Sequence, residues 1–394
     1  MSLLSAQGAN SSPDRGALAE LLALFGTVAD VVAGDAPDDG IAIASLAVAI
    51  ASIAGLPEKD RDALFWAALL RNAGAFGNPG LRKGDPLSER SATMLRWDVP
   101  ADGARTCAAI AALPEGTADL VRWQAEAWDG TGFPDQLRWN GIPKAAQTLH
   151  IASAYVGLRA EPEEGLACLA ADGGQRFAPE QTRTFIMWFH TFGGEITPLE
   201  APADSLSAGT APHDIVELLA DRVDDHNGTA RRWRRIGRRA DALATALGLQ
   251  AQQIRRVTLA SALFGLGELS AAAPEAQRFD PLSRLGIEGR AANAIAAAEL
   301  IAAFPVVADL ASVVRARAEW YDGTGLPDRM RHDEIPIESQ VLAACVAYDG
   351  LDDRFGSGAA SPSLSPLEQL ESVAGTQFDP RVVRALADVA KVRP

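Results

Sequence analysis

Two short segments of the sequence bring together residue types that could bind a metal ion or shape a tight loop. Asp129-Gly130-Thr131-Gly132-Phe133-Pro134-Asp135 returns as Asp322-Gly323-Thr324-Gly325-Leu326-Pro327-Asp328, and each follows a glutamate, Glu126 or Glu319. Carboxylates are ligands for divalent cations. The structural alternative is that the glycines permit unusual backbone angles, while Asp129 and Asp322 accept hydrogen bonds from their own turns.

The repeat is wider than this motif. Five pairs of identical residues are each separated by 193 positions: Gly55 and Gly248, Leu70 and Leu263, Gly74 and Gly267, Asp129 and Asp322, and Pro143 and Pro336. From about residue 39 to residue 158, the two copies therefore align without a net gap. This regularity predicts duplication of a whole domain.

The elements that must position the two loops are helical. Leu64, Ala67, Ala68 and Arg71 follow the spacing of one helix face, as do Trp233, Ile236, Gly237 and Ala240 in the second copy. Gly55, Gly74, Gly248 and Gly267 are predicted to end helices in the left-handed conformation. The predicted fold is all-α, with a flexible tail over residues 1–16, domains over 17–195 and 214–394, and a linker over 196–213.

Composition excludes several classes of function. The net charge of −15 argues against extensive nucleic-acid binding and against binding to anionic membranes, because both need basic surface. The three cysteines contain no CxxC pair, which is typical of a reducing compartment and predicts a cytoplasmic protein. The apolar run over residues 41–56 is shorter than a membrane span and is predicted to be a buried helix, so no membrane span is expected.

Glu126-Ala127-Trp128-Asp129-Gly130-Thr131-Gly132-Phe133-Pro134, followed by Ile142-Pro143, resembles the HHExWDGxGYP…IP signature of the HD-GYP family, and residues 319–336 resemble it equally. The resemblance covers nearly all of both copies. It implies a helical domain of the HD phosphohydrolase superfamily, whose members hydrolyse cyclic di-GMP with two or three metal ions. Histidines and aspartates from several helices hold these ions in the family.

The resemblance places the family's metal ligands on residues of other types. The HDxGK element falls on Arg71-Asn72-Ala73-Gly74-Ala75 and Phe264-Gly265-Leu266-Gly267-Glu268. The remaining aligned positions are Gln124-Ala125 and Arg317-Ala318 for the histidine pair, Asp39 and Arg232 for the early histidine, Val99 and either Ala292 or Asn293 for the middle histidine, and Ser153 and Val346 for the late aspartate. Only Asp39 is a plausible ionic ligand, so we predict no metal, no other cofactor and no phosphodiesterase activity.

The preferred hypothesis is a signalling adaptor or regulator that acts through protein contacts in cyclic di-GMP signalling. The two motif loops would dock a protein partner, because the family's loop is implicated in contacts with diguanylate cyclases. A second hypothesis is a nucleotide sensor whose ligand occupies the former metal pocket, predicted to be lined by Arg71, Asn72, Gln124, Glu126 and Ser153, with Arg71 holding a phosphate or pairing with Asp39 or Glu126. A third is a phosphohydrolase with the unusual ligands Asp39, Glu126, Asp129 and Asp135.

One basic helix stands apart from these sites. Residues 231–239 include six arginines beside an apolar stripe. They either form a solvated face balanced by Asp221, Asp224, Asp225 and Asp241, or bind an anion such as a phosphate, a nucleotide or an acidic partner helix.

Overall fold

The computed structural model of the chain describes residues 12–77, 89–269, 281–356 and 364–391. These residues form helices joined by loops, and the only β-type pairings among them are two isolated bridges, Gly173 with Phe177 and Ala374 with Phe378. The predicted all-α fold is confirmed. The chain divides into two compact units, Ala6–Ile215 and Val216–Pro394, which we call the first and second unit.

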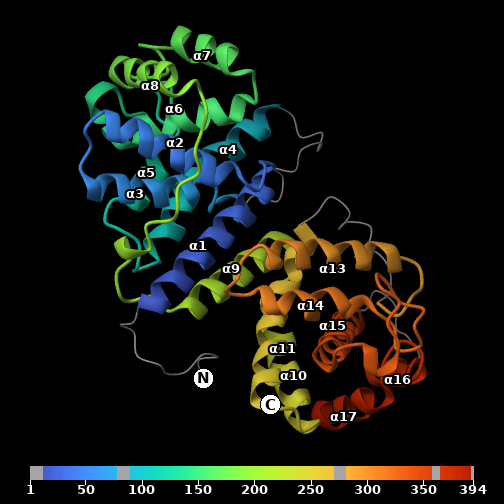
Figure 1. Cartoon of the computed structure of the whole chain (residues 1–394). Coiled ribbons are helices and arrows are strands. Elements are labelled where there is room, and N and C mark those ends of the chain that lie inside the picture. The colour runs from blue at the N-terminus through green and yellow to red at the C-terminus, as the bar shows by residue number, and fades with distance from the viewer. Residues whose placement is uncertain (1–11, 78–88, 270–280, 357–363, 392–394) are drawn as a thin grey trace. The chain divides into compact units, whose positions relative to one another are not determined.

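The first unit packs its helices in layers (Figure 1). Within it, α7 and α8 lie at the end opposite α1, and α2, α3 and α6 lie between them. Its elements are α1 (Ser12–Ala33), α2 (Asp39–Ile53), α3 (Glu58–Leu69), η1 (Ala75–Gly77), α4 (Glu89–Ala108), α5 (Thr117–Trp123), η3 (Trp139–Gly141), α6 (Lys144–Leu158), α7 (Pro162–Ala171), α8 (Pro179–Phe192) and η4 (Ala203–Ser205).

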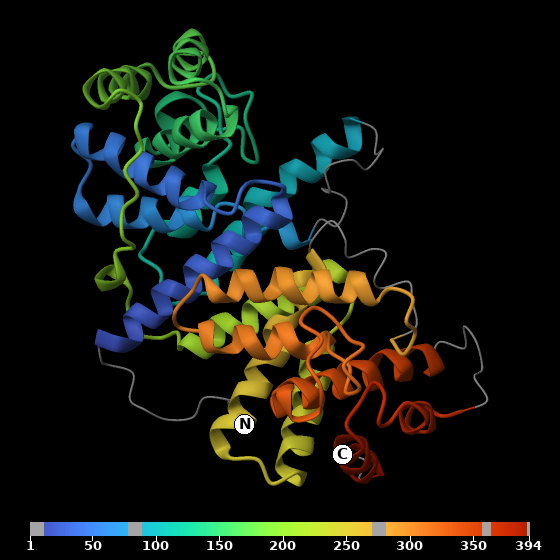
Figure 2. The same ribbon diagram turned by 45° about the vertical axis from the view of Figure 1, so that its right-hand side comes forward.

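The second unit places α10 and α11 side by side, and α13 beside α14 (Figures 1 and 2). Its elements are α9 (Pro212–Asn227), which begins just before the unit boundary, α10 (Arg232–Ala246), α11 (Ala251–Leu263), η5 (Phe264–Leu269), α13 (Ile287–Ala302), η6 (Ala308–Leu310), α14 (Ala311–Arg315), η7 (Ala316–Ala318), η8 (His332–Glu334), α15 (Ile337–Gly356), α16 (Pro366–Ser372) and α17 (Pro380–Lys391).

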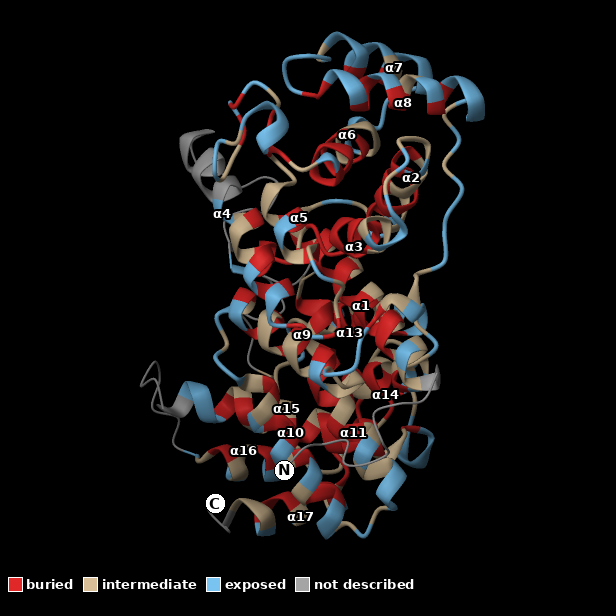
Figure 3. Ribbon diagram, turned by 90° about the vertical axis from the view of Figure 1, so that its left-hand side faces the viewer, coloured by how far each residue is buried: buried red, intermediate tan, exposed pale blue. Residues whose placement is uncertain are grey.

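The apolar stripes predicted from helical spacing form the cores of the units. Each residue of the two predicted stripes is buried, including Arg71, which lies just beyond the end of α3. The apolar run over residues 41–56 forms the buried helix α2, as predicted. The segment Asp14–Ala33 of α1 is also long and apolar enough to cross a membrane, but 61% of it is buried (Figure 3). It packs as a core helix through residues such as Leu22, Phe25 and Val28.

Two of the four predicted helix-ending glycines have a different role. Gly55 and Gly248 each have a φ of +71° just after a helix, as expected for a left-handed helix end. Gly74 and Gly267 have no such φ, so that prediction was wrong for them. A Cβ atom on Gly74 would meet the carbonyl oxygen of Val99, and one on Gly267 would meet that of Asn293. These glycines therefore allow two backbones to approach closely, and the matching contact makes Asn293, not Ala292, the counterpart of Val99.

The segments predicted to be a tail and a linker are partly ordered. α1 begins at Ser12, so residues 12–16 are helical, and residues 1–11 lie outside the described part of the chain. The predicted linker over 196–213 follows the surface of the first unit. Its Leu199 N donates to Ser45 Oγ at 2.9 Å, and its Ser205 Oγ accepts from Trp66 Nε1 at 3.0 Å. This segment is therefore anchored to the first unit for much of its length.

Candidate functional site

A buried glutamate holds the motif loop of the first unit. Glu126 accepts hydrogen bonds from the backbone N–H groups of Asp135 at 2.7 Å and of Leu137 at 2.9 Å. Burial raises the pKa of Glu126, while these two amides oppose the shift. Arg122 then clamps the Asp135 carboxylate through two hydrogen bonds of 2.7 and 2.6 Å, and this pairing lowers the pKa of Asp135. Both carboxylates are thus occupied in shaping the loop.

The motif loop of the second unit is built with the same contacts. Glu319 accepts from the backbone of Asp328 at 2.5 Å and of Met330 at 3.2 Å. Arg315 clamps Asp328 through two hydrogen bonds of 2.8 Å. Both loops also contain a cis proline, at Phe133-Pro134 and at Leu326-Pro327. The two units therefore form this loop in the same way.

The first aspartate of each motif forms a local turn. Asp129 Oδ1 accepts from the backbone N of Thr131 at 2.9 Å and from its hydroxyl at 2.7 Å, which lowers the pKa of Asp129. Asp322 and Thr324 repeat both bonds at 2.8 and 2.6 Å. The intervening glycine, Gly130 in the first unit, has a φ of +82°. These contacts match the turn interpretation of the motif aspartates.

At the centre of the first unit, an arginine is neutralised by two aspartates. Arg71 pairs with Asp30 at 2.9 Å and with Asp35 at 3.0 Å, and its side chain is 5% exposed. Asn72 Nδ2 donates to the same two carboxylates, each at 2.9 Å. The sequence analysis expected Arg71 to bind a phosphate or to pair with Asp39 or Glu126. Instead, its guanidinium faces Asp30 and Asp35, which the sequence analysis did not single out.

Asp30 also holds the start of α2. Its Oδ2 accepts from the backbone N of Gly40 at 3.0 Å, which satisfies an amide of the first helical turn. Complete burial raises the pKa of Asp30 to about 7, although Arg71 lowers it. Asp39 faces elsewhere, because Arg159 binds it at 2.7 Å. Gln124 donates to the backbone oxygen of Arg71 at 2.8 Å. The centre is therefore filled by protein–protein hydrogen bonds.

The centre of the second unit contains arginines at other positions. Arg232 donates to both oxygens of Glu268, at 2.9 and 3.0 Å. The guanidinium groups of Arg232 and Arg317 each lie 5.3 Å from the ring centroid of Phe264. Burial lowers the pKa of Arg317 to about 10, which Glu268 opposes. Phe264 is the residue that corresponds to Arg71 at the repeat spacing of 193. The second unit therefore has its central positive charges at other positions, Arg232 and Arg317.

The arginine-rich helix α10 is largely neutralised by acidic side chains. Asp349, which is 2% exposed, accepts from Arg235 through two hydrogen bonds of 3.0 Å and also lies 3.7 Å from Arg239. Arg234 pairs at 2.8 Å with Asp221, one of the four acidic residues predicted to balance this helix. Most of the other acidic partners differ from those expected from the sequence. This pairing favours the balanced interpretation of the helix over an anion site.

One carboxylate in each unit has a role that the sequence analysis missed, because Asp224 was expected only to balance the charge of residues 231–239 and Asp30 was not considered. Asp224 accepts from the backbone N of Trp233 at 3.0 Å, just as Asp30 accepts from Gly40 at the start of the corresponding helix. The spacing between these aspartates is 194, one more than in the rest of the repeat. A one-residue gap before Asp39, placed with the help of Gly34 and Gly228, would have brought them into register.

A pocket of about 420 Å³ lies beside α6 and α7 in the first unit. Ala125 and Ser153, two of the positions aligned with family ligands, line it together with His150, Cys168 and Arg176. Ser153 Oγ is buried and has no hydrogen-bond partner among the described residues. Of the five residues predicted to line the former metal pocket, only Ser153 lines this one. Arg71 and Asn72 face the aspartates, and Glu126 faces the motif loop.

His150, to which the sequence analysis assigned no role, lies at this pocket in its neutral form. Its Nδ1 lies 2.8 Å from the backbone oxygen of Glu126, and its Nε2 accepts from Arg176 Nε at 3.2 Å. Burial lowers the pKa of His150 to about 4, and the charge of Arg176 lowers it further. A neutral imidazole that donates through Nδ1 and accepts through Nε2 satisfies both neighbours.

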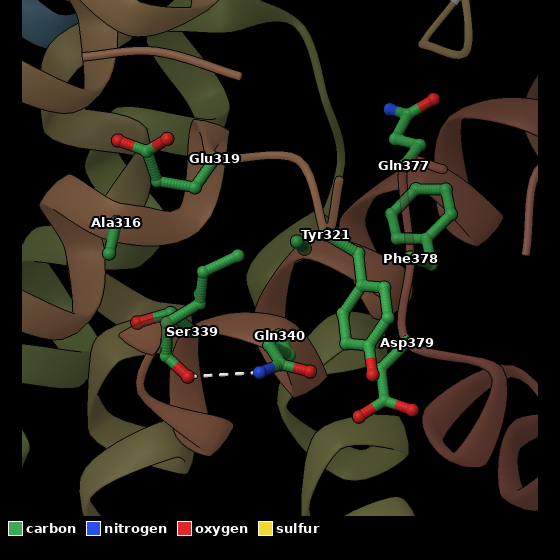
Figure 4. A pocket seen from close by; sticks show the side chains of 10 residues that line it. Ala316, Glu319, Tyr321, Ser339, Gln340, Gln377, Phe378 and Asp379 are labelled. Atoms are coloured by element: carbon green, nitrogen blue, oxygen red, sulfur yellow. Dashed lines mark hydrogen bonds between the residues drawn. The ribbon is translucent and has the colours of Figure 1, made fainter. Parts of the chain in front are cut away.

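The second unit has a much smaller cavity behind its motif loop (Figure 4). Its volume is about 10 Å³, the size of a single water molecule. Glu319, Tyr321 and Phe378 are among its walls, and Gln340 Nε2 donates to Ile335 O at 2.9 Å beside it. Ala343 and Gln377 stand here where the first unit has His150 and Arg176. Behind the motif loop, the described residues of the second unit therefore enclose a cavity far smaller than the 420 Å³ pocket of the first unit.

The residues at the aligned ligand positions do not fit a metal centre of the family's kind. Arginine has no lone pair to donate, and its fixed charge opposes a nearby cation. Within the described ranges, no three His, Cys, Asp or Glu side chains come together in a group that could hold an ion. The four carboxylates of the unusual-ligand hypothesis have separate partners: Arg159 for Asp39, backbone amides for Glu126, Thr131 for Asp129 and Arg122 for Asp135.

Comparison with known proteins places this geometry in context. Residues 215–382 match the model of the HD domain family. The chain is 24% identical over 298 residues, 71% of its length, to 3'3'-cGAMP-specific phosphodiesterase 3 of Vibrio cholerae, and 26% identical over 87 residues, 22% of its length, to the cyclic di-GMP phosphodiesterase of Thermotoga maritima. These matches cover 64% and 24% of the relatives, so the chain spans less than two thirds of either.

The fold is also shared with a solved structure. The crystal structure of a cyclic GMP-AMP specific phosphodiesterase of V. cholerae, V-cGAP3, superimposes with a TM-score of 0.69 at 19% identity. The superposition covers 96% of this chain and 98% of that one. This likeness shows that the chain shares its helical fold with that solved structure.

We expect Arg71→Met to destabilise the protein by about 3–5 kcal/mol, because it leaves Asp30 buried without its cation. The pKa of Asp30, about 7, lies above its ordinary value of 3.8, so its contribution to stability is complete below pH 3.8 and is lost as the pH rises through 7. Removal of Arg71 raises this pKa further. Urea unfolding should therefore show a larger loss at about pH 8 than at about pH 5.

The matched control is Lys144→Met, which removes an exposed ion pair with Glu180 and should cost less than about 1 kcal/mol. The double variant Asp30→Asn/Arg71→Met should recover part of the stability, because no buried charge is left unpaired. An equal loss at both pH values would contradict the proposed role of Asp30.

Proposed function

Since residues 215–382 match the HD domain family and the chain is similar to phosphodiesterases of cyclic di-GMP and 3'3'-cGAMP, we propose that it is a catalytically inactive HD-GYP-like signalling adaptor or regulator. It would be cytoplasmic and would consist of two degenerate copies of one domain. The observation that carries this proposal is the replacement of metal ligands by neutralised arginines. Arg71 pairs with Asp30 and Asp35 in the first unit, and Arg232 pairs with Glu268 in the second.

These ion pairs oppose the chemistry of the relatives in two ways. A guanidinium supplies positive charge but cannot coordinate and activate water as a metal ion does. The carboxylates close to these positions are already bound by arginines, so a metal would have to break buried ion pairs to enter. The centre of each unit then serves stability, and function lies at the surface.

We expect the purified chain to show no hydrolysis of cyclic di-GMP or 3'3'-cGAMP above the rate of a protein-free control, with Mn²⁺ or Fe²⁺ added. Elemental analysis should find well under one equivalent of transition metal per chain after dialysis. The decisive control is Asp39→Asn, because Asp39 is the one acidic residue at an aligned ligand position. Turnover in the wild-type chain that disappears in this variant would overturn the proposal.

The surface through which the adaptor would work is the motif loop of the first unit. Thr131 is exposed, and Trp139, at the end of the loop, is 58% exposed. In the second unit, the residue that corresponds to Trp139 at the repeat spacing of 193 is His332, whose ring packs edge-on against Tyr321. The first loop therefore offers the aromatic anchor that a protein partner such as a diguanylate cyclase would bury.

Substitution of Trp139 by alanine should abolish retention of this partner, because a buried aromatic anchor commonly carries 2 kcal/mol or more of binding energy, about 30-fold in affinity. The measurement is affinity capture from a native extract, with the retained proteins identified by mass spectrometry. Phe192→Ala is the matched control, since Phe192 is 54% exposed on α8, outside the motif loop. Equal retention by both variants would exclude the loop as the docking surface.

A second candidate function is nucleotide sensing at the 420 Å³ pocket of the first unit. Arg176 could pair with a phosphate, and the unpartnered hydroxyl of Ser153 could accept or donate a further hydrogen bond. This pocket includes two positions aligned with ligands of the resembled family, which is the observation that favours it. Neutral His150 would orient Arg176 through Nε2.

For this candidate, titration calorimetry should detect cyclic di-GMP binding to the wild-type chain, and Arg176→Ala should weaken it by roughly tenfold or more, the value of a charge-assisted hydrogen bond. Arg183→Ala, which removes another exposed arginine on α8, is the control. The absence of heat with cyclic di-GMP and 3'3'-cGAMP at millimolar concentrations would remove the sensor hypothesis.

A further inference from the structure

A groove of about 480 Å³ opens on the first unit, and neither Glu126 nor Arg71 lines it, although its wall residue Trp123 donates to Asp135 of the motif loop at 2.8 Å. It lies between the turn before α3, the start of α5 and the start of α6. Leu56, Leu120 and Trp123 are among its apolar walls, and three acidic residues line it: Asp60, Glu115 and Asp119. None of the three has an ion pair with another described residue. The groove therefore combines apolar walls with unneutralised negative charge.

The corresponding place in the second unit is occupied by an arginine of the chain itself. Arg256 NH1 binds Glu338 Oε1 at 2.9 Å, and Arg256 NH2 donates to the backbone oxygen of Asp309 at 2.9 Å. The Asp309 carboxylate lies 3.4 Å from Arg256 Nε. The guanidinium thus bridges the starts of α11, α14 and α15, the helices that correspond to α3, α5 and α6.

The first unit has small residues at each of these three positions. At the repeat spacing of 193, Ala63 stands for Arg256, Ala145 for Glu338 and Gly116 for Asp309. Loss of these side chains accounts for the open space. Ala63 and Ala145 are 2% and 7% exposed, so they form the floor of the groove.

The charged residues around this space also differ between the two units. Where the first unit has the acidic residues of the groove, the second unit has the neutral residues Gln253, Ala308 and Ser312 at the same spacing. The unit with an internal guanidinium has neutral residues at these three positions, and its nearby acids Asp309 and Glu338 pair with that guanidinium, whereas the unit without one has three acids there. Lys144, the basic residue of the groove lining, is already paired with Glu180 at 2.7 Å. Charge complementarity therefore identifies a cation as the missing group.

We propose that this groove receives an arginine side chain from a basic segment of a partner protein, which takes the place that Arg256 occupies in the second unit. The guanidinium would lie between Asp60, Glu115 and Asp119. The aliphatic stem would pack on Leu120 and Trp123, because arginine buries its stem on apolar surface while its head pairs with carboxylates. The groove is larger than one guanidinium requires, so an apolar neighbour of the arginine would fill the remaining space beside Leu56.

This inference agrees with an adaptor but does not require the chain to be inactive, because the groove is separate from the aligned ligand positions. Binding at the groove and hydrolysis of cyclic dinucleotides are measured independently. A chain that hydrolyses them and still binds the basic segment would contradict only the proposed function.

The test uses the full chain and the capped tripeptide Ac-Leu-Arg-Leu-NH2, with a twin in which citrulline replaces arginine. Citrulline has nearly the same shape but no charge. Binding is followed by the indole N–H resonance of Trp123, assigned with Trp123→Phe. We expect the arginine peptide to shift this resonance, the citrulline peptide to bind at least tenfold more weakly, and added salt to reduce the difference.

The first variant removes the negative charges that line the groove. The three rim residues are not in the core, so Asp60→Asn/Glu115→Gln/Asp119→Asn should fold normally and weaken arginine-peptide binding roughly tenfold, the combined effect of three exposed ion pairs. Glu161→Gln/Glu163→Gln/Glu164→Gln, three exposed acids that do not line the groove, is the matched control and should bind as the wild type does.

The second variant fills the groove with side chains of the chain itself. Ala63→Arg/Ala145→Glu recreates the ion pair of the second unit and should abolish binding while the thermal unfolding temperature is kept or raised. The proposal is overturned if the peptide does not bind at millimolar concentration, if the citrulline twin binds equally well, or if the rim variant binds as tightly as the wild type.

Discussion

The two units depend on one requirement, which is that a guanidinium removed from water must be neutralised by acidic groups at close range. Transfer of an unpaired charge to a protein interior costs several kcal/mol even after relaxation. In the first unit, Asp30 and Asp35 satisfy Arg71, and Asp30 also holds the start of α2. The position of the helix and the charge of the arginine are therefore coupled through one carboxylate. Neither can change without leaving a buried polar group unsatisfied.

The second unit meets the same requirement with different residues. Its cations are Arg232 and Arg317, its anions are Glu268 and Asp349, and Phe264 lies against both guanidinium groups. Asp224 keeps the helix-holding role of Asp30. The two units thus place their buried charges at different positions, whereas both contain the hydrogen bond that holds the start of the helix. This difference explains why the positions aligned with the family's metal ligands hold unlike residues in the two units, whereas the motif loops share nearly every contact.

Much of the fold was predictable from the sequence, because it rests on local patterns. Helical spacing identified the buried face of α10, and the motif residues identified two turns that the structure builds alike. The partners of the central arginines were not predictable. Asp30 lies outside the segment that aligns without a gap, and Asp349 gives no local signal because its role depends on arginines more than 100 residues away. Gly74 and Gly267 were misassigned for a related reason, since the backbones they contact are distant in sequence.

The glutamate of the motif shows why a family signature can persist beside an altered centre. Glu126 and Glu319 each accept two backbone amides across the motif loop, so their removal would leave buried N–H groups without partners. The residues aligned with the family's histidines do not hold the motif loop in this way, and arginine, glutamine or alanine can stand there if its own charge is balanced. A signature composed mainly of loop-forming residues therefore predicts the structure of the loop. The chemistry has to be judged from the side chains at the centre, which here are ion pairs between protein groups.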